Sequence, residues 1–209
     1  MPSASPADAG RGPIVFFFDF ASGYAYFAAR EIEALGARVG RPVLWRPYML
    51  GTAFKLTGAQ GLSSTPLKKD YAARDWARIA RLKGVPFRLP PHHPSVALAA
   101  TRAFYVIDAQ DPALAVRFAR AVLDGYFQDG LDSADPAAVG ALAVRLGLDA
   151  AALMQAAATA QVKAQVKDIS QQAVAAGVFG SPFFLVDGEP FWGWDRMEMM
   201  ERWIRAGGW

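Results

Sequence analysis

Residues 14–30, IVFFFDFASGYAYFAAR, combine a short apolar strand with the start of a helix. The run from Ile14 to Phe18 is made of β-branched and aromatic residues, which is typical of a buried strand. Apolar side chains then recur at helical spacing from Tyr24 to Val39. Ser22 falls in the break between the two, where a strand ends and a helix begins. We therefore predict that Ser22 caps this helix, because serine is a favoured N-cap residue.

The N-terminus of this helix would favour a bound negative charge, because first-turn N–H groups and the helix dipole both point there. The chain has 0 cysteines, which excludes disulfides, thiolate metal sites and a cysteine nucleophile. Ser22 cannot be redox active, but its hydroxyl can hold a thiolate supplied by a bound thiol. The simpler alternative is that Ser22 acts only as a helix cap.

Composition is consistent with a folded chain of 209 residues, since 53% are hydrophobic and 12% aromatic. The net charge of +3 is nearly balanced, and the basic cluster in residues 74–88 is too small to indicate nucleic acid. We find no membrane-spanning segment and no signal-peptide core in residues 1–13. We therefore expect a cytoplasmic protein with a flexible N-terminal tail over residues 1–13, and neither a nucleic-acid nor a membrane partner.

After the first helix, Pro42–Pro47 reads as a second strand, and a strand–helix–strand opening favours parallel pairing. Tyr48–Pro66 reads as a loop or a short irregular helix. Helical spacing then predicts helices over residues 68–83, 95–109, 112–128, 136–146, 149–158 and 161–176.

The C-terminal part returns to strand spacing. Residues 182–186 and 189–192 read as strands joined by a hairpin turn at Asp187–Gly188. We expect Asp195 to cap a final helix over residues 196–205. This order predicts an α/β fold, in which a sheet domain is interrupted by an all-α helical insertion. The expected boundaries are 14–60 and 178–209 for the sheet domain and 61–177 for the insertion.

Three motifs together resemble one family. They are FDFASGYAYFA at residues 18–28, the Phe54–Lys55 and Lys68–Tyr71–Asp75–Arg78–Gly84–Pro86 spacing, and GVFGSPFFLVDGEPFWGWDR at residues 177–196. They are similar to the 2-hydroxychromene-2-carboxylate isomerases, which are related to kappa-class glutathione transferases and DsbA-like thioredoxin folds. The resemblance extends over residues 14–205. It implies a thioredoxin-like fold with a helical insertion, glutathione as cofactor, a small aromatic carboxylate as substrate, and a homodimer.

The resemblance also implies a glutathione site. Ser22 would lie beside the glutathione sulfur, and Ser181–Pro182 would form a cis-proline loop that pairs its backbone with the tripeptide. The γ-glutamyl end would be held by Trp192, Gly193, Trp194 and Asp195, with the Asp195 carboxylate facing its ammonium group. The alternatives are an ordinary proline at the start of a strand and a helix-capping Asp195, and the capping and binding roles of Asp195 can coexist.

Lys55, His93 and His92 are the candidate substrate contacts. The resemblance implies that Lys55, placed in a loop, attracts a carboxylate, and that His93 contacts the substrate, while an imidazole can move protons near neutral pH. The alternatives are a solvated lysine and histidines exposed on a turn. The two histidines lack a third ligand, so we predict no metal site. Asp75 and Arg78 read as a structural ion pair.

The chain departs from the family pattern near the expected substrate. Ser22–Gly23–Tyr24 replaces the usual Ser-Pro-Tyr, which removes a rigid first helical turn. The expected loop asparagine is Ala59, and the Asn-Arg pair that isomerases can show falls near Leu62–Ser64. Glutathione binding is therefore better supported by the motifs than the identity of the substrate.

These features favour a glutathione-dependent isomerase of aromatic catabolism. It would convert a 2-hydroxychromene-2-carboxylate-type acid to trans-o-hydroxybenzylidenepyruvate, with a glutathione thiolate stabilised by Ser22. One alternative is a kappa-like glutathione transferase that conjugates electrophiles, so that the sulfur stays on the product. The other is a non-catalytic glutathione-binding protein, in which Gly23 and Ala59 mark a decayed site.

Overall fold

The computed structural model describes residues 12–209, so the predicted tail over residues 1–13 lies almost wholly outside the described part. Its centre is a four-stranded mixed sheet with strand order β2-β1-β3-β4. Strand β1 pairs in parallel with β2 and antiparallel with β3, and β3 pairs antiparallel with β4. The strands are β1 (Ile14–Phe18), β2 (Val43–Pro47), β3 (Phe183–Val186) and β4 (Glu189–Trp192). The predicted strand–helix–strand opening and the C-terminal hairpin are thus confirmed.

Alternate side chains of β1 point to opposite faces of the sheet, as the two-residue period of a strand requires. Phe16 and Phe18 belong to a large core that also contains residues of α1 (Gly23–Val39) and α9 (Met197–Ala206). Phe17, on the opposite face, packs in a smaller cluster that includes Ala173 of α8 (Ala160–Ala175). The two apolar faces explain why the opening run is apolar at every position and does not alternate.

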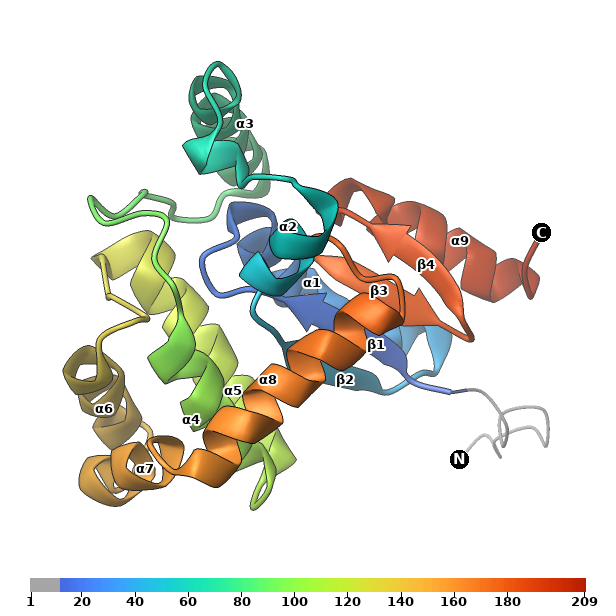
Figure 1. Ribbon diagram of the computed structural model, residues 1–209. Helices are drawn as coiled ribbons and strands as arrows, with labels where there is room; N and C mark the ends of the chain where they lie inside the picture. Colours follow the sequence, from blue (N-terminus) through green and yellow to red (C-terminus); the bar gives the residue numbers. More distant parts are fainter. Residues whose placement is uncertain (1–11) are drawn as a thin grey trace.

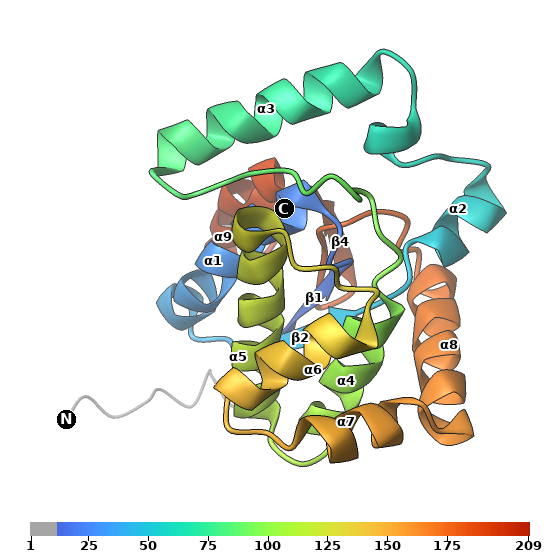
Figure 2. The same cartoon turned by 90° about the vertical axis from the view of Figure 1, so that its left-hand side faces the viewer.

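The remaining helices belong to the segment between β2 and α8. They are α2 (Gly51–Thr57), α3 (Lys68–Lys83), α4 (Leu98–Asp108), α5 (Pro112–Asp124), α6 (Pro136–Arg145) and α7 (Ala150–Ala157). Helices α4 to α7 form a group beside the sheet (Figure 1), and α3 lies across the molecule between two extended connectors (Figure 2). None of the helices within residues 12–209 is long and apolar enough to cross a membrane. One core joins residues of α4 and α5 to β1, and the division at residues 60 and 178 stays a prediction.

Three local predictions are wrong in detail. Lys55 lies in helix α2, so the loop placement of Lys55 is wrong, while the short helix given as the alternative for Tyr48–Pro66 is confirmed. Helix α5 ends at Asp124 and passes into a π turn, Gly125–Asp129, so the predicted helix over 112–128 changes its hydrogen bonding before its end. Asp195 does not cap the final helix, because a 3₁₀ turn, Trp194–Arg196, comes first and makes Arg196 the N-cap of α9.

Glu201 ties α9 to α1 through a small ion-pair network. Its carboxylate accepts hydrogen bonds from Arg38 Nη2 at 2.6 Å and Arg205 Nη2 at 2.8 Å, which hold the pKa of Glu201 at about 2. The pKa is lowered in the folded state, so this stabilisation is present above the unfolded pKa near 4.5 and is lost as pH falls toward 2. We expect Glu201→Gln to lower the free energy of unfolding at pH 7 by about 0.5–1 kcal/mol, because both arginines are half exposed. Urea unfolding at pH 7 and pH 3 measures it, and an equal loss at both pH values would contradict it.

Candidate active site

Ser22 caps α1, as predicted, and faces the loop before β3. Its Oγ accepts a hydrogen bond from the Ala25 N–H at 3.3 Å and donates one to the Ser181 carbonyl oxygen at 2.8 Å. Within the described residues, the N–H groups of Gly23 and Tyr24 have no hydrogen-bond partner, as is usual in a first helical turn. A hydroxyl and two free donors therefore meet at one positive helix terminus.

Asp19 holds this bend together, and it was not singled out from the sequence. Its N–H donates to Ser181 Oγ at 2.8 Å, while its carboxylate accepts from the Ala21 N–H at 2.9 Å and the Leu50 N–H at 3.3 Å. Burial raises the pKa of Asp19 above its ordinary value. The sequence signal for this role is a single acidic residue inside the aromatic run FFFDF. A carboxyl group buried in such a run needs hydrogen-bond donors as partners.

The Ser181–Pro182 peptide is cis, as predicted. The loop is anchored on both sides, because Tyr48 OH donates to the Gly180 carbonyl oxygen at 2.8 Å and the Gly193 N–H donates to the Pro182 carbonyl oxygen at 3.1 Å. The second contact places the segment Trp192–Asp195 directly beside the cis-proline loop. Two of the predicted glutathione-binding segments therefore meet.

Within that segment the side chains lie differently. Trp192 packs over Gly180, where an added Cβ would lie 2.1 Å from the indole Nε1, and its side chain is 56% exposed. Trp194 is partly buried, with Lys83 Nζ 5.1 Å from the centre of its ring. The Asp195 carboxylate is exposed and forms an ion pair with Arg196 Nη2 at 3.4 Å.

Gly23 is required by a neighbouring tryptophan. An ideal Cβ at Gly23 would lie 2.7–2.9 Å from indole atoms of Trp76, which is 4% exposed. Trp76 also meets the rings of Tyr24 and His93 edge-on, with ring centres 5.6 and 5.7 Å away. A proline at position 23 would also carry a Cβ and would meet the same indole atoms. The packing of Trp76 therefore explains why this chain has Ser-Gly-Tyr and not Ser-Pro-Tyr. Its indole N–H is buried with no partner among the described residues.

His93 lies in a hydrogen-bonded chain. Its Nε2 is 2.6 Å from Ser63 Oγ and its Nδ1 is 3.0 Å from Tyr126 OH. Burial, with a smaller effect of His92, lowers the pKa of His93 to about 4, so the imidazole is neutral at pH 7. His92 packs edge-on against the Tyr126 ring, with ring centres 5.6 Å apart, and its Nε2 is 4.0 Å from Asp132 Oδ1. The partnership of His93 with Ser63 was not expected from the sequence.

Lys55 is exposed on α2 and forms no ion pair within residues 12–209. No hydrogen bond or ion pair among the described residues joins it to Ser22 or His93. The predicted ion pair of Arg78 with Asp75 is confirmed at 2.6 Å, and Asp75 also accepts a hydrogen bond from Tyr24 OH at 2.9 Å. The ion pair lies within α3, and the hydrogen bond from Tyr24 connects α3 to α1.

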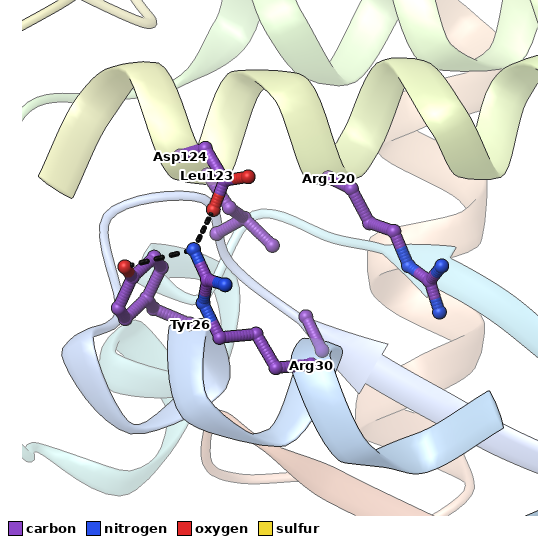
Figure 3. Close-up of a pocket in the computed structure, with 6 residues that line it drawn as sticks. Tyr26, Arg30, Arg120, Leu123 and Asp124 are labelled. Carbon is purple, nitrogen blue, oxygen red and sulfur yellow. Dashed lines mark hydrogen bonds and ion pairs between the residues drawn. The ribbon is translucent and has the colours of Figure 1, made fainter. Parts of the chain in front are cut away.

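A separate pocket of about 180 Å³ lies between α1 and α5 (Figure 3). Arg30 donates to Tyr26 OH at 3.0 Å and forms an ion pair with Asp124 there. Because these groups satisfy one another, we assign them the structural role of joining the two helices. The described residues contain no group of three or more His, Cys, Asp or Glu side chains that could hold a metal ion.

The fold and the serine-bearing bend define the class of protein. Residues 13–205 match the DsbA-like thioredoxin domain, and the chain belongs to that family. It is 30% identical over 194 residues to the 2-hydroxychromene-2-carboxylate isomerase of Sphingobium xenophagum, covering 91% of this chain and 97% of the relative. It is 26% identical over 176 residues to human glutathione S-transferase kappa 1, covering 76% and 78%.

A solved 2-hydroxychromene-2-carboxylate isomerase structure superposes with a TM-score of 0.80 at 24% identity, covering 92% of this chain and 94% of the other. The predicted thioredoxin-like α/β fold is therefore confirmed, and the relatives are enzymes of the isomerase and glutathione transferase classes.

Proposed function

We propose that this protein is a glutathione-dependent isomerase of an aromatic 2-hydroxychromene-2-carboxylate-type acid, which it converts to trans-o-hydroxybenzylidenepyruvate. The observation that carries the proposal is the Ser22 hydroxyl at the N-terminus of α1, 2.8 Å from the Ser181 carbonyl oxygen, in a chain with 0 cysteines. A thioredoxin-like bend without its own sulfur suits a thiol supplied by a ligand. Glutathione, when bound, supplies the thiolate that adds reversibly to the substrate and leaves unchanged.

The residues at the bend fit a thiolate on energetic grounds. A free thiol has a pKa of about 8.5, and a charged hydrogen bond and a helix dipole contribute on the order of 1–2 kcal/mol each. Together they would lower the thiol pKa by about one to two units. Ser22 must turn its proton from the Ser181 carbonyl oxygen toward the sulfur. We expect the hydrogen bond to the thiolate to prevail over the one to the carbonyl oxygen. A hydrogen bond to a charged group is worth about 1.5–3 kcal/mol, and one between neutral groups about 1 kcal/mol.

The rest of glutathione would lie along the cis-proline loop. Ser181 and Pro182 would offer backbone groups to the tripeptide, and the segment Trp192–Asp195 would hold the γ-glutamyl end. The contact between the Gly193 N–H and the Pro182 carbonyl oxygen supports a single continuous binding surface. The exposed Asp195 carboxylate suits an ammonium group.

We assign the substrate to the side where α2 and the proline-rich connector lie. Lys55, exposed on α2, would attract the substrate carboxylate, and His93 would lie near its ionisable oxygens, with His92 at the edge. From the resemblance to the isomerase family we also propose that the protein is a homodimer. We place it in the cytoplasm, where glutathione is the main thiol buffer. Light scattering of the purified chain tests the dimer.

A kappa-like transferase is the second candidate, and the bend supports it equally because both reactions need the same thiolate. A non-catalytic glutathione-binding protein is less favoured, since Trp76 fills the space at Gly23. The decisive experiment is calorimetric titration of glutathione, with thiolate absorbance followed across pH and with product analysis of 2-hydroxychromene-2-carboxylate. Binding, a lowered thiol pKa and catalytic use of glutathione support the isomerase. Stoichiometric consumption of glutathione supports the transferase, and absence of binding at millimolar glutathione rejects all three.

A further inference from the structure

We propose that the Ser63 hydroxyl is a further catalytic group, a proton shuttle between the two oxygens of the substrate's ring-opening step, held in place by His93 and Tyr126. The inference rests on the proposed isomerase function and deepens it. It starts from a continuous chain of hydrogen bonds: Ser95 N–H to Tyr126 OH at 3.1 Å, Tyr126 OH to His93 Nδ1 at 3.0 Å, and His93 Nε2 to Ser63 Oγ at 2.6 Å.

The direction of this chain is fixed at one end by a backbone group. The Ser95 N–H can only donate, so the Tyr126 oxygen accepts from it. Burial raises the pKa of Tyr126, so its hydroxyl keeps its proton. In the proposed arrangement this hydroxyl donates to His93 Nδ1, 3.0 Å away. A neutral imidazole that accepts at Nδ1 carries its proton on Nε2. His93 then donates to Ser63 Oγ, which leaves the Ser63 proton free for an outside acceptor.

The two ends of the chain differ in exposure. Tyr126 is fully buried, whereas Ser63 is only partly buried on the 3₁₀ turn Leu62–Ser64. Ser63 ends the chain on the side away from Ser95, and its hydroxyl is therefore the group that we assign to the ligand. Trp76 connects it to the thiolate site, because the indole contacts Gly23 on one side and the His93 ring on the other. The hydroxyl and the α1 N-terminus therefore belong to one region.

A hydroxyl held in this way matches what ring opening requires. A 2-hydroxychromene-2-carboxylate is a cyclic hemiketal, so opening breaks the ring C–O bond and forms a C=O bond at the same carbon. The hydroxyl proton of that carbon passes to Ser63 Oγ while the Ser63 proton passes to the departing phenolic oxygen. Atoms and charges balance without an added acid, base or oxidant. A neutral His93 holds the hydroxyl without taking the proton, which suits a positioning residue.

The kinetic test compares Ser63→Ala with Ser63→Thr, which keeps the hydroxyl, and with Ser64→Ala at the exposed next position. General acid–base groups contribute about 10²–10⁴-fold, and water can replace part of this, so we expect Ser63→Ala to lower kcat at least about tenfold with little change in KM. Ser63→Thr should recover most of the rate, and Ser64→Ala should keep it. Conjugation of glutathione to an aryl halide should be unaffected in all three variants, because thiolate attack with loss of halide needs no proton shuttle.

A second measurement does not depend on turnover. Nitrogen NMR of the free protein should show His93 neutral at pH 7 as the Nε2–H tautomer, and a predominant Nδ1–H tautomer would overturn the chain direction. If the wild type isomerises the chromene and Ser63→Ala does so at the same rate, the shuttle is wrong and the proposed function stands. If the wild type binds glutathione but does not isomerise, the proposed function itself fails, and the shuttle falls with it.

Discussion

Replacing Ser22 by alanine should raise the pKa of bound glutathione by about one unit and lower kcat/KM about 100-fold. The variant removes a donor aimed at a developing or full negative charge, and loss of one such donor typically costs about 10²–10³-fold in rate. One pKa unit corresponds to about 1.4 kcal/mol, which is within the range of one charge-assisted hydrogen bond. Thiolate absorbance of the glutathione complex across pH measures the first quantity, and steady-state kinetics at fixed pH the second.

The Ser22 variant also loses a helix cap, and a matched control separates this effect. Thr159 caps α8 by accepting a hydrogen bond from the Val162 N–H. Thr159→Ala should cost about 1 kcal/mol of stability, as Ser22→Ala should, but should leave the glutathione pKa and the rate unchanged. An unchanged thiol pKa in Ser22→Ala, with the same stability loss in both variants, would reduce Ser22 to a cap.

Local sequence patterns predicted most of the fold, because each element here has its own signal. The opening strand carries β-branched and aromatic residues, α1 begins at a serine cap, and Asp187–Gly188 adopts the positive φ angles expected of the hairpin turn. One failure is Lys55, which lies in the short helix α2 and not in a loop. The other two fall where the chain changes from one helical form to another. The 3₁₀ turn before α9 and the π turn after α5 have side-chain spacing close to that of an α-helix, so the sequence alone does not separate them.

The candidate site was predictable where a motif lies within a few residues, as for Ser22 and the cis-proline loop. It was not predictable where residues far apart in sequence meet. Asp19 and Ser181 are joined by one hydrogen bond across 162 positions, and Ser63 and His93 by another across 30. Gly23 shows the same limit, because its departure from the family pattern suggested a loosened helix. Trp76 occupies the space instead, and nothing in the local sequence indicates that contact.

Gly23→Ala should therefore destabilise the protein by about 1–3 kcal/mol, since extra methyl groups in a packed site force their neighbours to move. The added Cβ would lie 2.7 Å from a buried indole ring that has no free end to swing away. At an open first-turn position the same change usually stabilises a protein by about 0.4–1 kcal/mol, because alanine restricts the unfolded chain. Gly51 provides that control, as it is the first residue of α2 and an added Cβ there meets nothing within 4 Å.

A double-mutant cycle with Trp76→Leu tests the cause. If the clash is with the indole, the Gly23→Ala penalty should largely disappear in the Trp76→Leu background, with a coupling energy of at least about 1 kcal/mol between neighbours in contact. Urea unfolding of the four proteins measures it. Equal losses of stability in both backgrounds would mean that position 23 needs the backbone freedom of glycine, and that a clash with Trp76 is not the cause. Rescue would mean instead that Gly23 and Trp76 form one packing unit, so that in this chain the indole holds the first turn of α1.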